Sequence, residues 1–383
     1  MSRPANAPPR ILHLHSTFAP GGKELRCVQL INAFGPALHH AIVSAEPNEM
    51  GAAQHLSQRA KVSYPQDFPS LTGKPLPGRL NRLAQAMKPY DMVLTYNWGA
   101  MDAVMAHTLF KDALGLPPLI HHEDGFNEDE QKKLKWSRNL YRKLALGKAN
   151  GLVVPSETLE QIALETWEQP IGRVRLIPNG IDTKAFAKKP KRDALRRIIK
   201  RPDEKWVGTL AGLRPVKNLP ALVRAFAALP EPWQLVIVGD GPEADAIREE
   251  AERLDLSPRV HLPGFAPDPA RYIGLFDIFA LSSHSEQFPI SVVEAMAAGL
   301  PVAAPAVGDI AHMVAEENAG LITRPGSDAE LGEALRELAQ DEAKRKIIGA
   351  ANQAKAREHF DQKAMIATYR RLYSSALGQE IAG

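Results

Sequence analysis

The chain contains very little cysteine. Cys27 is its one cysteine among 383 residues, so no disulfide can form within the chain, and a reducing cytoplasm suits the sequence. Long apolar runs are missing too, since no stretch approaches the roughly 20 apolar residues of a membrane-spanning helix. The first ten residues are polar and proline-rich and lack the apolar core of a signal peptide. We therefore expect a cytoplasmic protein, either free or peripherally attached to the inner face of the cell membrane.

A strong net charge is also absent. The 47 Lys and Arg residues are balanced by 44 Asp and Glu residues, which leaves a formal net charge of +3. Nucleic-acid-binding domains usually carry a clear basic excess, so we expect no nucleic-acid partner. With 44% hydrophobic residues, the chain is long enough to bury two cores.

Short apolar runs alternate with helix-length segments along the chain. This alternation is typical of a parallel sheet covered by helices. The first six expected strands are Ile11–His15, Ala41–Ser44, Met92–Thr95, Leu119–His121, Gly151–Val154 and Val174–Ile177. The pattern then restarts with Lys205–Ala211, Leu235–Gly239, Val260–Leu262, Ile278–Ser282, Pro301–Ala304 and Gly320–Ile322. The basic, proline-containing segment Lys184–Arg201 is expected to connect two domains.

The expected fold class is α/β, with two doubly wound Rossmann-like domains that face a central cleft. We place the first domain at 1–183 and the second at 184–361, and we expect a C-terminal helix at about 362–380 to pack back on the first domain. Ligands of such sheets bind at the carboxyl ends of the strands. Functional residues are therefore expected in the turns after the strands.

Two strand-to-helix turns are rich in glycine. Gly21 and Gly22 follow the first strand, and Gly212 follows the first strand of the second domain. Glycine lets the backbone approach a ligand, and the N–H groups at a helix N-terminus attract phosphate. Arg214 and Lys217 would add positive charge at the second turn. Taken alone, the first turn can equally be an ordinary connection, and the second is better explained as a solvated basic turn.

The segment Ser282–Gly299 carries the strongest functional pattern. Pro289 suits the first turn of a helix, where no N–H is missed. Glu286 lies in the loop before this helix, while Glu294 lies within it and leans toward its N-terminus. Phosphate would repel both carboxylates, so each is expected to face hydroxyls, such as those of a sugar and a ribose.

At this segment the sequence resembles the family 4 glycosyltransferases, which have the GT-B fold. The family signature contains two glutamates separated by seven residues, as Glu286 and Glu294 are. Ile177–Asp182, Val238–Glu243 and Glu294–Val302 match further segments of the family. The resemblance covers essentially the whole chain.

The resemblance implies a role for each matching residue. Glu286 would hold hydroxyls of the transferred sugar, Glu294 would hold the ribose, and Lys217 would bind the diphosphate. The nucleotide base would lie near Phe265. The full set of expected donor-binding residues is Gly21, Gly22, Gly212, Arg214, Lys217, Gly239, Phe265, Ser283, Phe288, Pro289, Ile290, Ser291 and Glu294.

The donor domain departs from the family pattern at two positions. Gly212 stands where an arginine usually partners the lysine, and Arg214 is the candidate substitute. Gln287 follows the first glutamate, where glycine is usual.

The acceptor domain departs from the family pattern in one loop. The family often has His-Gly there, and alignment on the glycine places Asp124 at the histidine position. The catalytic candidates are therefore Glu286, Asp124 and two preceding histidines, His121 and His122. The alternative for His121 is a core histidine with a satisfied partner.

No Asp-x-Asp pattern occurs in the chain, so the usual carboxylate clamp for a divalent metal is missing. Lys217, Arg214 and helix N–H groups would instead stabilise the charge that grows on a leaving nucleoside diphosphate. The resemblance implies a retaining, metal-independent hexosyltransferase without a cofactor. Its donor would be a nucleotide-sugar, expected to be a UDP-sugar, and its acceptor a glycan or a lipid-linked molecule of the cell envelope. A nucleotide-sugar epimerase of similar fold and a non-catalytic nucleotide-sugar binder remain the alternatives.

The basic segment 131–148 is the candidate for contact with an anionic membrane. Seven basic residues lie from Lys132 to Lys148 without an acidic one, and aromatic and leucine residues are interleaved. Asn127 and Glu130 form a capping box for a helix expected to run to about Leu146. Such a helix either lies in a headgroup layer or packs its apolar stripe on its own domain.

Overall fold

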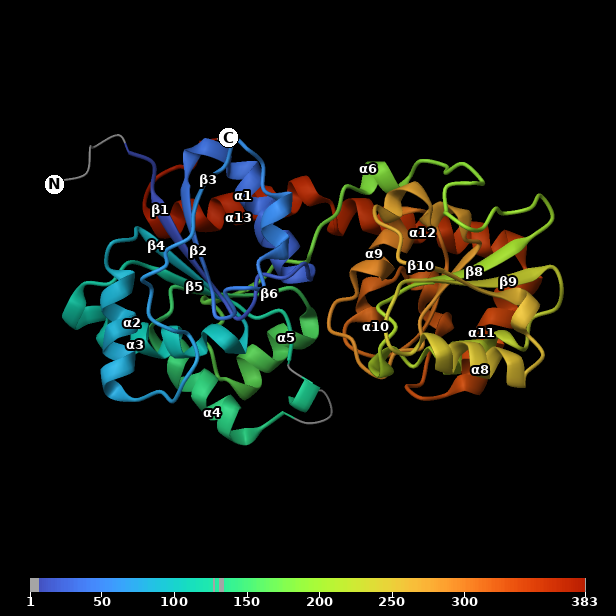
Figure 1. Cartoon of the computed structure of the whole chain (residues 1–383), viewed down its shortest axis with the longest axis horizontal. Coiled ribbons are helices and arrows are strands. Elements are labelled where there is room, and N and C mark those ends of the chain that lie inside the picture. Colours follow the sequence, from blue (N-terminus) through green and yellow to red (C-terminus); the bar gives the residue numbers. More distant parts are fainter. Residues whose placement is uncertain (1–6, 127, 131–133, 383) are drawn as a thin grey trace. The chain divides into compact units, whose positions relative to one another are not determined.

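The computed structural model of the chain describes residues 7–126, 128–130 and 134–382. The chain forms two compact units. Unit 1 consists of Met1–Pro178 and Met365–Gly383, and unit 2 consists of Asn179–Ala364. In Figure 1, unit 1 runs from blue to green with a red C-terminal helix, while unit 2 is mainly yellow and orange.

Each unit is built around one parallel sheet. The strands of unit 1 are β1 (Arg10–His15), β2 (His39–Ser44), β3 (Lys61–Ser63), β4 (Met92–Tyr96), β5 (Leu119–His122), β6 (Gly151–Val154) and β7 (Val174–Leu176). Those of unit 2 are β8 (Lys205–Leu210), β9 (Trp233–Val238), β10 (Val260–Gly264), β11 (Ile278–Ala280), β12 (Val302–Pro305) and β13 (Ile322–Thr323).

The strand order reverses once in each sheet. Unit 1 has the order β3-β2-β1-β4-β5-β6-β7, and unit 2 has β10-β9-β8-β11-β12-β13. The reversal lies between β1 and β4 in the first sheet and between β8 and β11 in the second. Such a switch point leaves a crevice at the carboxyl ends of the strands, where ligands of doubly wound sheets bind.

Helices cover both faces of each sheet. In unit 1 they are α1 (Gly22–Phe34), α2 (Pro77–Met87), α3 (Met101–Leu114), α4 (Trp136–Ala145), α5 (Glu157–Gln161) and α13 (Gln362–Leu377). In unit 2 they are α6 (Thr183–Phe186), α7 (Leu219–Phe226), α8 (Ala244–Arg253), α9 (Ile290–Ala297), α10 (Ile310–Met313), α11 (Asp328–Gln340) and α12 (Glu342–His359). None of the helices in the described ranges combines the length and apolar character needed to cross a bilayer.

The strands are buried on both faces because their side chains alternate between two cores. Ile11 of β1 packs with α1 and α13, whereas the neighbouring Leu12 packs with α2 and α3. Likewise, Trp206 and Val207 of β8 enter opposite cores of unit 2. This explains why the strands appear in the sequence as nearly continuous apolar runs.

The C-terminal helix α13 belongs to unit 1 although the preceding α12 belongs to unit 2. Met365, Tyr369 and Tyr373 of α13 pack in the same core as Ile11 and Phe34. In Figure 1, α13 (red) lies along the blue elements at the start of the chain.

Candidate functional site

The turn after β8 brings two cations to the switch point of unit 2. Lys217 ends a short 3-10 turn, and Asn218, which follows it, adopts a left-handed conformation before α7. Arg214 is exposed. Its Nε lies 3.6 Å from the position that a Cβ atom on Gly212 would occupy. The side chain of Arg214 therefore lies beside the place from which the family arginine would extend.

Lys217 and Glu286 form an ion pair across the β8–β11 switch point. The Nζ atom of Lys217 lies 2.5 Å from Oε1 of Glu286, and both side chains are mostly buried. Ser283 donates a second hydrogen bond, of 2.7 Å, to the same carboxylate oxygen. The backbone of His284 and the hydroxyl of Ser282 bind carbonyl groups of the 215–217 turn. The structure thus brings together three residues that sequence analysis had placed in one site.

Two glycines allow the neighbouring loops to approach this ion pair. Gly308 has φ of 57°, and a Cβ atom on it would lie 2.5 Å from the carbonyl oxygen of Glu286. Gly239 has φ of 152°, and its Cβ would lie 1.8 Å from the carbonyl oxygen of Ala211. Both positions require glycine, because backbone occupies the space of a side chain. Gly239 therefore fixes the loop geometry around the turn that carries Arg214.

The loop after Glu286 leads into α9 through a buried aromatic side chain. Phe288 packs against Phe360, with ring centroids 5.6 Å apart. Pro289 lies directly before the helix in an extended conformation, one position earlier than the predicted first turn. Ile290 and Ser291 begin the helix, where backbone N–H groups have no partner in the preceding turn.

Glu294 lies in α9 as a largely buried acid. Burial raises the pKa of its carboxyl to about 8. Burial, and then the nearby Glu294 carboxylate, also raise the pKa of the Tyr272 hydroxyl. Tyr272 and Phe265 both line a cavity of about 850 Å³ in unit 2. Glu294 is therefore electrostatically coupled to the wall of the cavity that contains the predicted base-binding residue.

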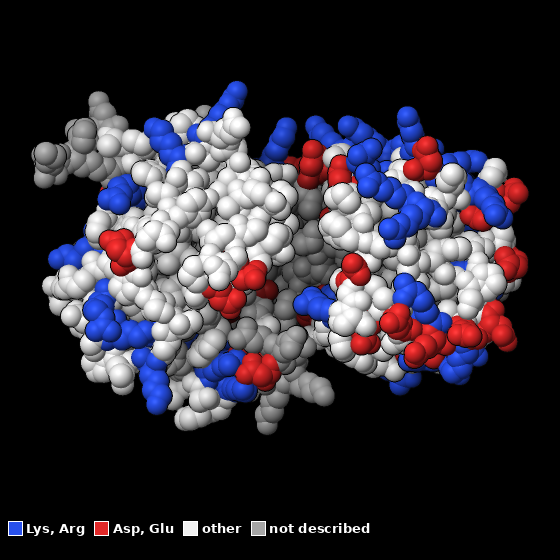
Figure 2. Space-filling view, viewed as in Figure 1, with Lys and Arg blue, Asp and Glu red and all other residues white. Residues whose placement is uncertain are grey.

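This cavity is markedly basic. Its cationic lining residues are Lys188, Lys189, Lys191, Arg196 and Arg271. Figure 2 shows Lys and Arg gathered on unit 2 over the segment that follows α6. Phe265 is 75% exposed at this cavity, so its ring is available to a planar ligand.

In unit 1, a carboxylate occupies the turn before α1. Gly21 precedes the helix, and a Cβ atom on it would lie 2.7 Å from Oε2 of Glu24. Glu24 is buried and pairs with Lys23. By contrast, a Cβ atom on Gly22 would meet nothing within 4 Å. Sequence analysis did not identify Glu24, whose charge makes the turn better suited to hydroxyls than to phosphate alone.

Asp124 forms a bidentate ion pair with Arg26 of α1. Oδ2 of Asp124 lies 2.8 Å from Nη2 of Arg26, and a second contact joins Oδ1 to Nη1. Burial lowers the pKa of the Arg26 guanidinium, but the charge of Asp124 more than offsets this effect, and the net shift is upward. Asn97 accepts a hydrogen bond from the Asp124 backbone N–H. The carboxylate at the predicted catalytic position is therefore held by a partner 98 residues away in sequence.

The two histidines before this loop lie in the core of unit 1. His121 is fully buried and shares a 2.8 Å hydrogen bond between its Nδ1 and the Thr95 hydroxyl. His122 is fully buried too, and its Nε2 lies 2.9 Å from the Tyr373 hydroxyl of α13. Burial lowers the pKa of His122. These contacts favour the core-histidine alternative for His121 and extend it to His122.

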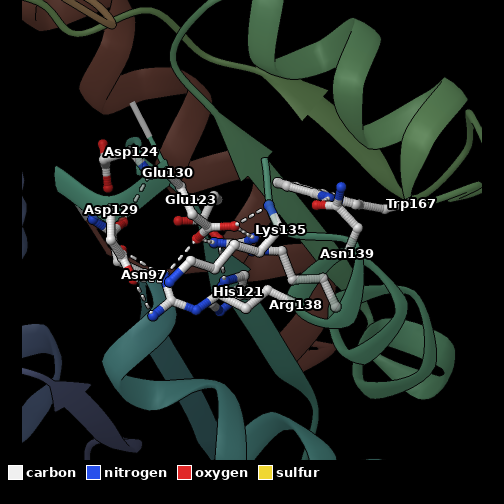
Figure 3. A network of polar contacts seen from close by, with 11 residues as sticks. Asn97, His121, Glu123, Asp124, Asp129, Glu130, Lys135, Arg138, Asn139 and Trp167 are labelled. Atoms are coloured by element: carbon white, nitrogen blue, oxygen red, sulfur yellow. Dashed lines mark hydrogen bonds and ion pairs between the residues drawn. The ribbon is translucent and has the colours of Figure 1, made fainter. Parts of the chain in front are cut away.

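A buried ionic network lies beside the loop that carries Asp124 (Figure 3). Arg142 of α4 is fully buried and lies between the carboxylates of Glu123 and Glu130, at 3.2 and 3.1 Å. Its guanidinium also lies 4.9 Å from the ring centroid of Trp98 and 5.2 Å from that of Trp167. The network fixes α4 to the loop that carries Asp124.

The start of α4 differs from the predicted helix. Among the described residues, α4 begins at Trp136, so the predicted helix start was wrong. Oε1 of Glu130 accepts a hydrogen bond from the backbone N–H of Lys135, directly before α4. Asn127, Lys132 and Lys133 lie outside the described residues, so the capping box itself stays a prediction.

A further polar cluster lies beneath α1. Ligand atoms of His13, His15 and Cys27 lie within 4.8 Å of one another, so the group could hold a metal ion. His13 already hydrogen-bonds His40 and Tyr96. Burial lowers the pKa values of His13, His15 and His40. Hydrogen bonds account for His13, whereas the ring of His15 stacks on Tyr96 and neither of its nitrogens has a hydrogen-bond partner among the described residues.

Comparison with known proteins agrees with this arrangement. Residues 20–185 match the family described as Glycosyltransferase Family 4, and residues 191–355 match Glycosyl transferases group 1. The chain is 30% identical over 247 residues to the putative glycosyltransferase EpsF of Bacillus subtilis, with 59% of this chain and 62% of EpsF covered. It is 25% identical to the D-inositol 3-phosphate glycosyltransferase of Corynebacterium glutamicum, with 84% of this chain and 80% of that protein covered.

A solved structure shows the same fold. Anabaena HepE in complex with UDP superimposes with a TM-score of 0.80 at 23% identity, covering 96% of this chain and all of that one. A family model matches each half of the chain, and each half contains one parallel sheet of this fold. The protein therefore belongs to the family 4 glycosyltransferases.

Proposed function

We propose that the protein is a retaining, metal-independent glycosyltransferase that transfers a hexose from a UDP-sugar to a lipid-linked acceptor. The carrying observation is the Lys217–Glu286 ion pair, which lies at the switch point of unit 2 before the N-terminus of α9. UDP is the nucleotide bound by the similar Anabaena protein.

Donor binding would divide this ion pair between two partners. Lys217 would turn to the diphosphate, joined by Arg214 and the first N–H groups of α9. Glu286, released from the lysine, would accept hydrogen bonds from sugar hydroxyls. Glu294 would bind the ribose, with the base at the cavity that Phe265 lines.

Catalysis would come from charge stabilisation at the leaving diphosphate. Negative charge grows there as the glycosidic bond breaks, and fixed cations and helix N–H groups lower the barrier. This replaces the task of a divalent metal, in keeping with the missing Asp-x-Asp pattern. The departing phosphate would help to deprotonate the acceptor on the same face, which retains configuration, and we assign no enzymatic nucleophile.

The test is product analysis with a panel of nucleotide-sugars in EDTA, using membrane lipid extract as acceptor. We expect UDP release together with a glycosylated lipid, and loss of both in Glu286→Ala. Formation of an epimeric nucleotide-sugar without UDP release would establish the epimerase alternative. Binding without any turnover would establish the non-catalytic alternative, and loss of activity in EDTA with rescue by magnesium would overturn metal independence.

Peripheral membrane contact through α4 is part of this proposal. Trp136, Leu140 and Leu144 are 76%, 40% and 56% exposed. Their spacing of four residues places them on one helix face. Among the described residues this apolar stripe is exposed, which supports the membrane alternative.

The basic residues around α4 support electrostatic binding to an anionic membrane less than the sequence predicted. Among the described residues, Lys135 and Arg138 pair with Asp129, Lys143 pairs with Glu168, and Lys148 pairs with Asp112. The sequence pattern has no acid from 132 to 148, but the fold brings acidic partners from outside that segment. We therefore propose binding that depends mainly on apolar insertion.

A further inference from the structure

We propose that a cavity at the carboxyl ends of β2 and β3 binds a hydrocarbon chain of the acceptor. The cavity has a volume of about 560 Å³, and all of its lining residues belong to unit 1. This inference rests on the proposed transfer reaction and specifies the chemistry of its acceptor. Small-molecule sites typically occupy roughly 300–1,000 Å³, so one chain segment fits the space.

The cavity wall is apolar and aromatic. Val43 at the end of β2, Met50 in the following loop, and Tyr64, Phe68 and Leu71 after β3 form its main surfaces. None of its lining residues carries a charge. A phosphate or a carboxylate would therefore find no cation in the wall.

Three polar side chains in the wall, those of Ser44, Gln66 and Ser70, are already engaged by their own loops. The Ser44 hydroxyl donates to the carbonyl oxygen of Glu46 at 2.8 Å, and the Gln66 amide donates to that of Tyr64 at 3.0 Å. The Ser70 hydroxyl lies 2.9 Å from the Thr72 hydroxyl. A sugar needs several free hydrogen-bonding groups, whereas a hydrocarbon chain needs none. The wall consequently suits hydrocarbon better than sugar.

One wall is fixed to the turn that leads into α1. The backbone N–H of Phe18 donates to Glu49, and that of Ala52 donates to Phe18, at 2.8 and 2.9 Å. A Cβ atom on Gly51 would lie 2.9 Å from Pro20. The loop that forms this wall therefore contacts the chain directly before the Gly21–Gly22 turn, one of the turns expected to hold substrate.

The opposite wall is fixed by a partly buried arginine. Arg79 of α2 donates hydrogen bonds to the carbonyl oxygens of Ser70 and Leu71 and pairs with Asp102. Phe68 and Leu71 also pack against the core of unit 1. Because both walls are tied to the fold, the cavity is formed before ligand binds.

A chain-length series of alkyl β-D-glucosides tests this inference on the full-length protein. Methyl, hexyl, heptyl and octyl glucosides would be titrated by calorimetry below their micellar concentrations. Burying one methylene tightens binding by about fourfold. We expect affinity to rise by about that factor for each added methylene, with no binding of the methyl glucoside over the same range.

Two variants locate the site. Tyr64→Asp places a charge in the wall and should remove the dependence on chain length, whereas Tyr64→Phe keeps the wall and should retain it. Tyr64 is 41% exposed, so the substitution is not expected to unfold unit 1. Ile171→Asp is the matched control, because Ile171 is 80% exposed and does not line the cavity.

UDP binding by each variant separates this inference from the proposed function. If UDP binds but no alkyl glucoside does, the cavity inference is overturned while the transferase proposal stands. An unchanged chain-length dependence in Tyr64→Asp would also overturn it and would place the hydrocarbon elsewhere, for example on α4. If alkyl glucosides bind with the expected chain-length dependence but no nucleotide-sugar binds, the transferase proposal is overturned and the hydrocarbon site stands.

Discussion

Among single residues, Glu294 links donor binding to pH. Its buried carboxyl has a pKa of about 8. Ribose hydroxyls that donate to the carboxylate favour its charged form, so donor binding should lower this pKa and release a proton. We predict that affinity for a UDP-sugar increases as pH rises from about 6 to about 8, and then levels off. Titration calorimetry in two buffers of different ionisation enthalpy measures the released protons.

Glu294→Gln should abolish this proton release, while Glu316→Gln, an exposed acid in unit 2, should retain it. The same pKa has a consequence for stability. A carboxyl whose pKa is raised on folding destabilises the native state as pH rises from about 4.5 toward about 8. Glu294→Gln should therefore unfold at higher temperature than wild type at pH 8. Unchanged proton release in this variant would remove Glu294 from the donor site.

Arg214 is the second residue with a specific expectation. If it replaces the family arginine, Arg214→Ala should weaken UDP binding by about tenfold, the effect of one charge-assisted hydrogen bond. The double variant Gly212→Arg, Arg214→Ala should regain most of the loss. Arg248→Ala, which removes an exposed guanidinium paired with Asp245, is the control. Wild-type affinity in Arg214→Ala would show that this arginine does not contact the diphosphate.

The family pattern predicts Lys217, Ser283 and Glu286 as donor-binding residues in turns, and Glu294 as a donor-binding residue in a helix. It did not reveal Arg26 as the partner of Asp124, since the two residues are 98 positions apart. The burial of His121 and His122 depends on partners elsewhere in the chain: His121 contacts Thr95 of β4, and His122 contacts Tyr373 of α13.

At the scale of elements, α4 tests the membrane proposal. Trp136→Ser with Leu144→Ser should reduce sedimentation with anionic liposomes more than Lys143→Glu with Lys148→Glu does, because the lysines are already paired. Binding should fall only moderately at high salt. Ile347→Ser, which removes a 63% exposed side chain in unit 2, is the control. A wild-type protein that fails to sediment with anionic vesicles at low salt would contradict membrane contact.

The buried arginine of α4 predicts a large effect on stability. Arg142→Met would leave Glu123 and Glu130 without their main counter-charge, and breaking such a buried pair costs about 3–5 kcal/mol. Lys143→Met, at the next position, removes only an exposed pair and should cost less than about 1 kcal/mol. Hydrogen exchange of the unit 1 amides measures the stability loss in each of the two variants. Equal protection in the two variants would show that the network does not hold α4 in place.

Most strands were predictable because buried parallel strands are apolar on both faces. β3 was missed because Lys61, Val62 and Ser63 offer one apolar side chain at an edge of the sheet. The later start of α4 was not predictable from local signals, since Glu130 matches a capping pattern but is engaged by Arg138 and Arg142.

For the whole molecule, the alternation of strands and helices is enough to predict two doubly wound units. The assignment of α13 to unit 1 follows from tertiary packing of Tyr369 and Tyr373. The acceptor chemistry could not be predicted from motifs, because the cavity after β2 and β3 is assembled from loops without a recognisable pattern.

The most direct test of the central claim is calorimetric titration of a nucleotide-sugar panel and free UDP in EDTA, on wild type and Glu286→Gln. The account predicts that wild type binds at least one UDP-sugar more tightly than it binds UDP. Glu286→Gln should bind UDP with about the affinity of the wild type, but it should lose the additional affinity that the sugar provides. A wild-type protein that binds no nucleotide-sugar of the panel, or a variant that keeps the full gain, would contradict the account.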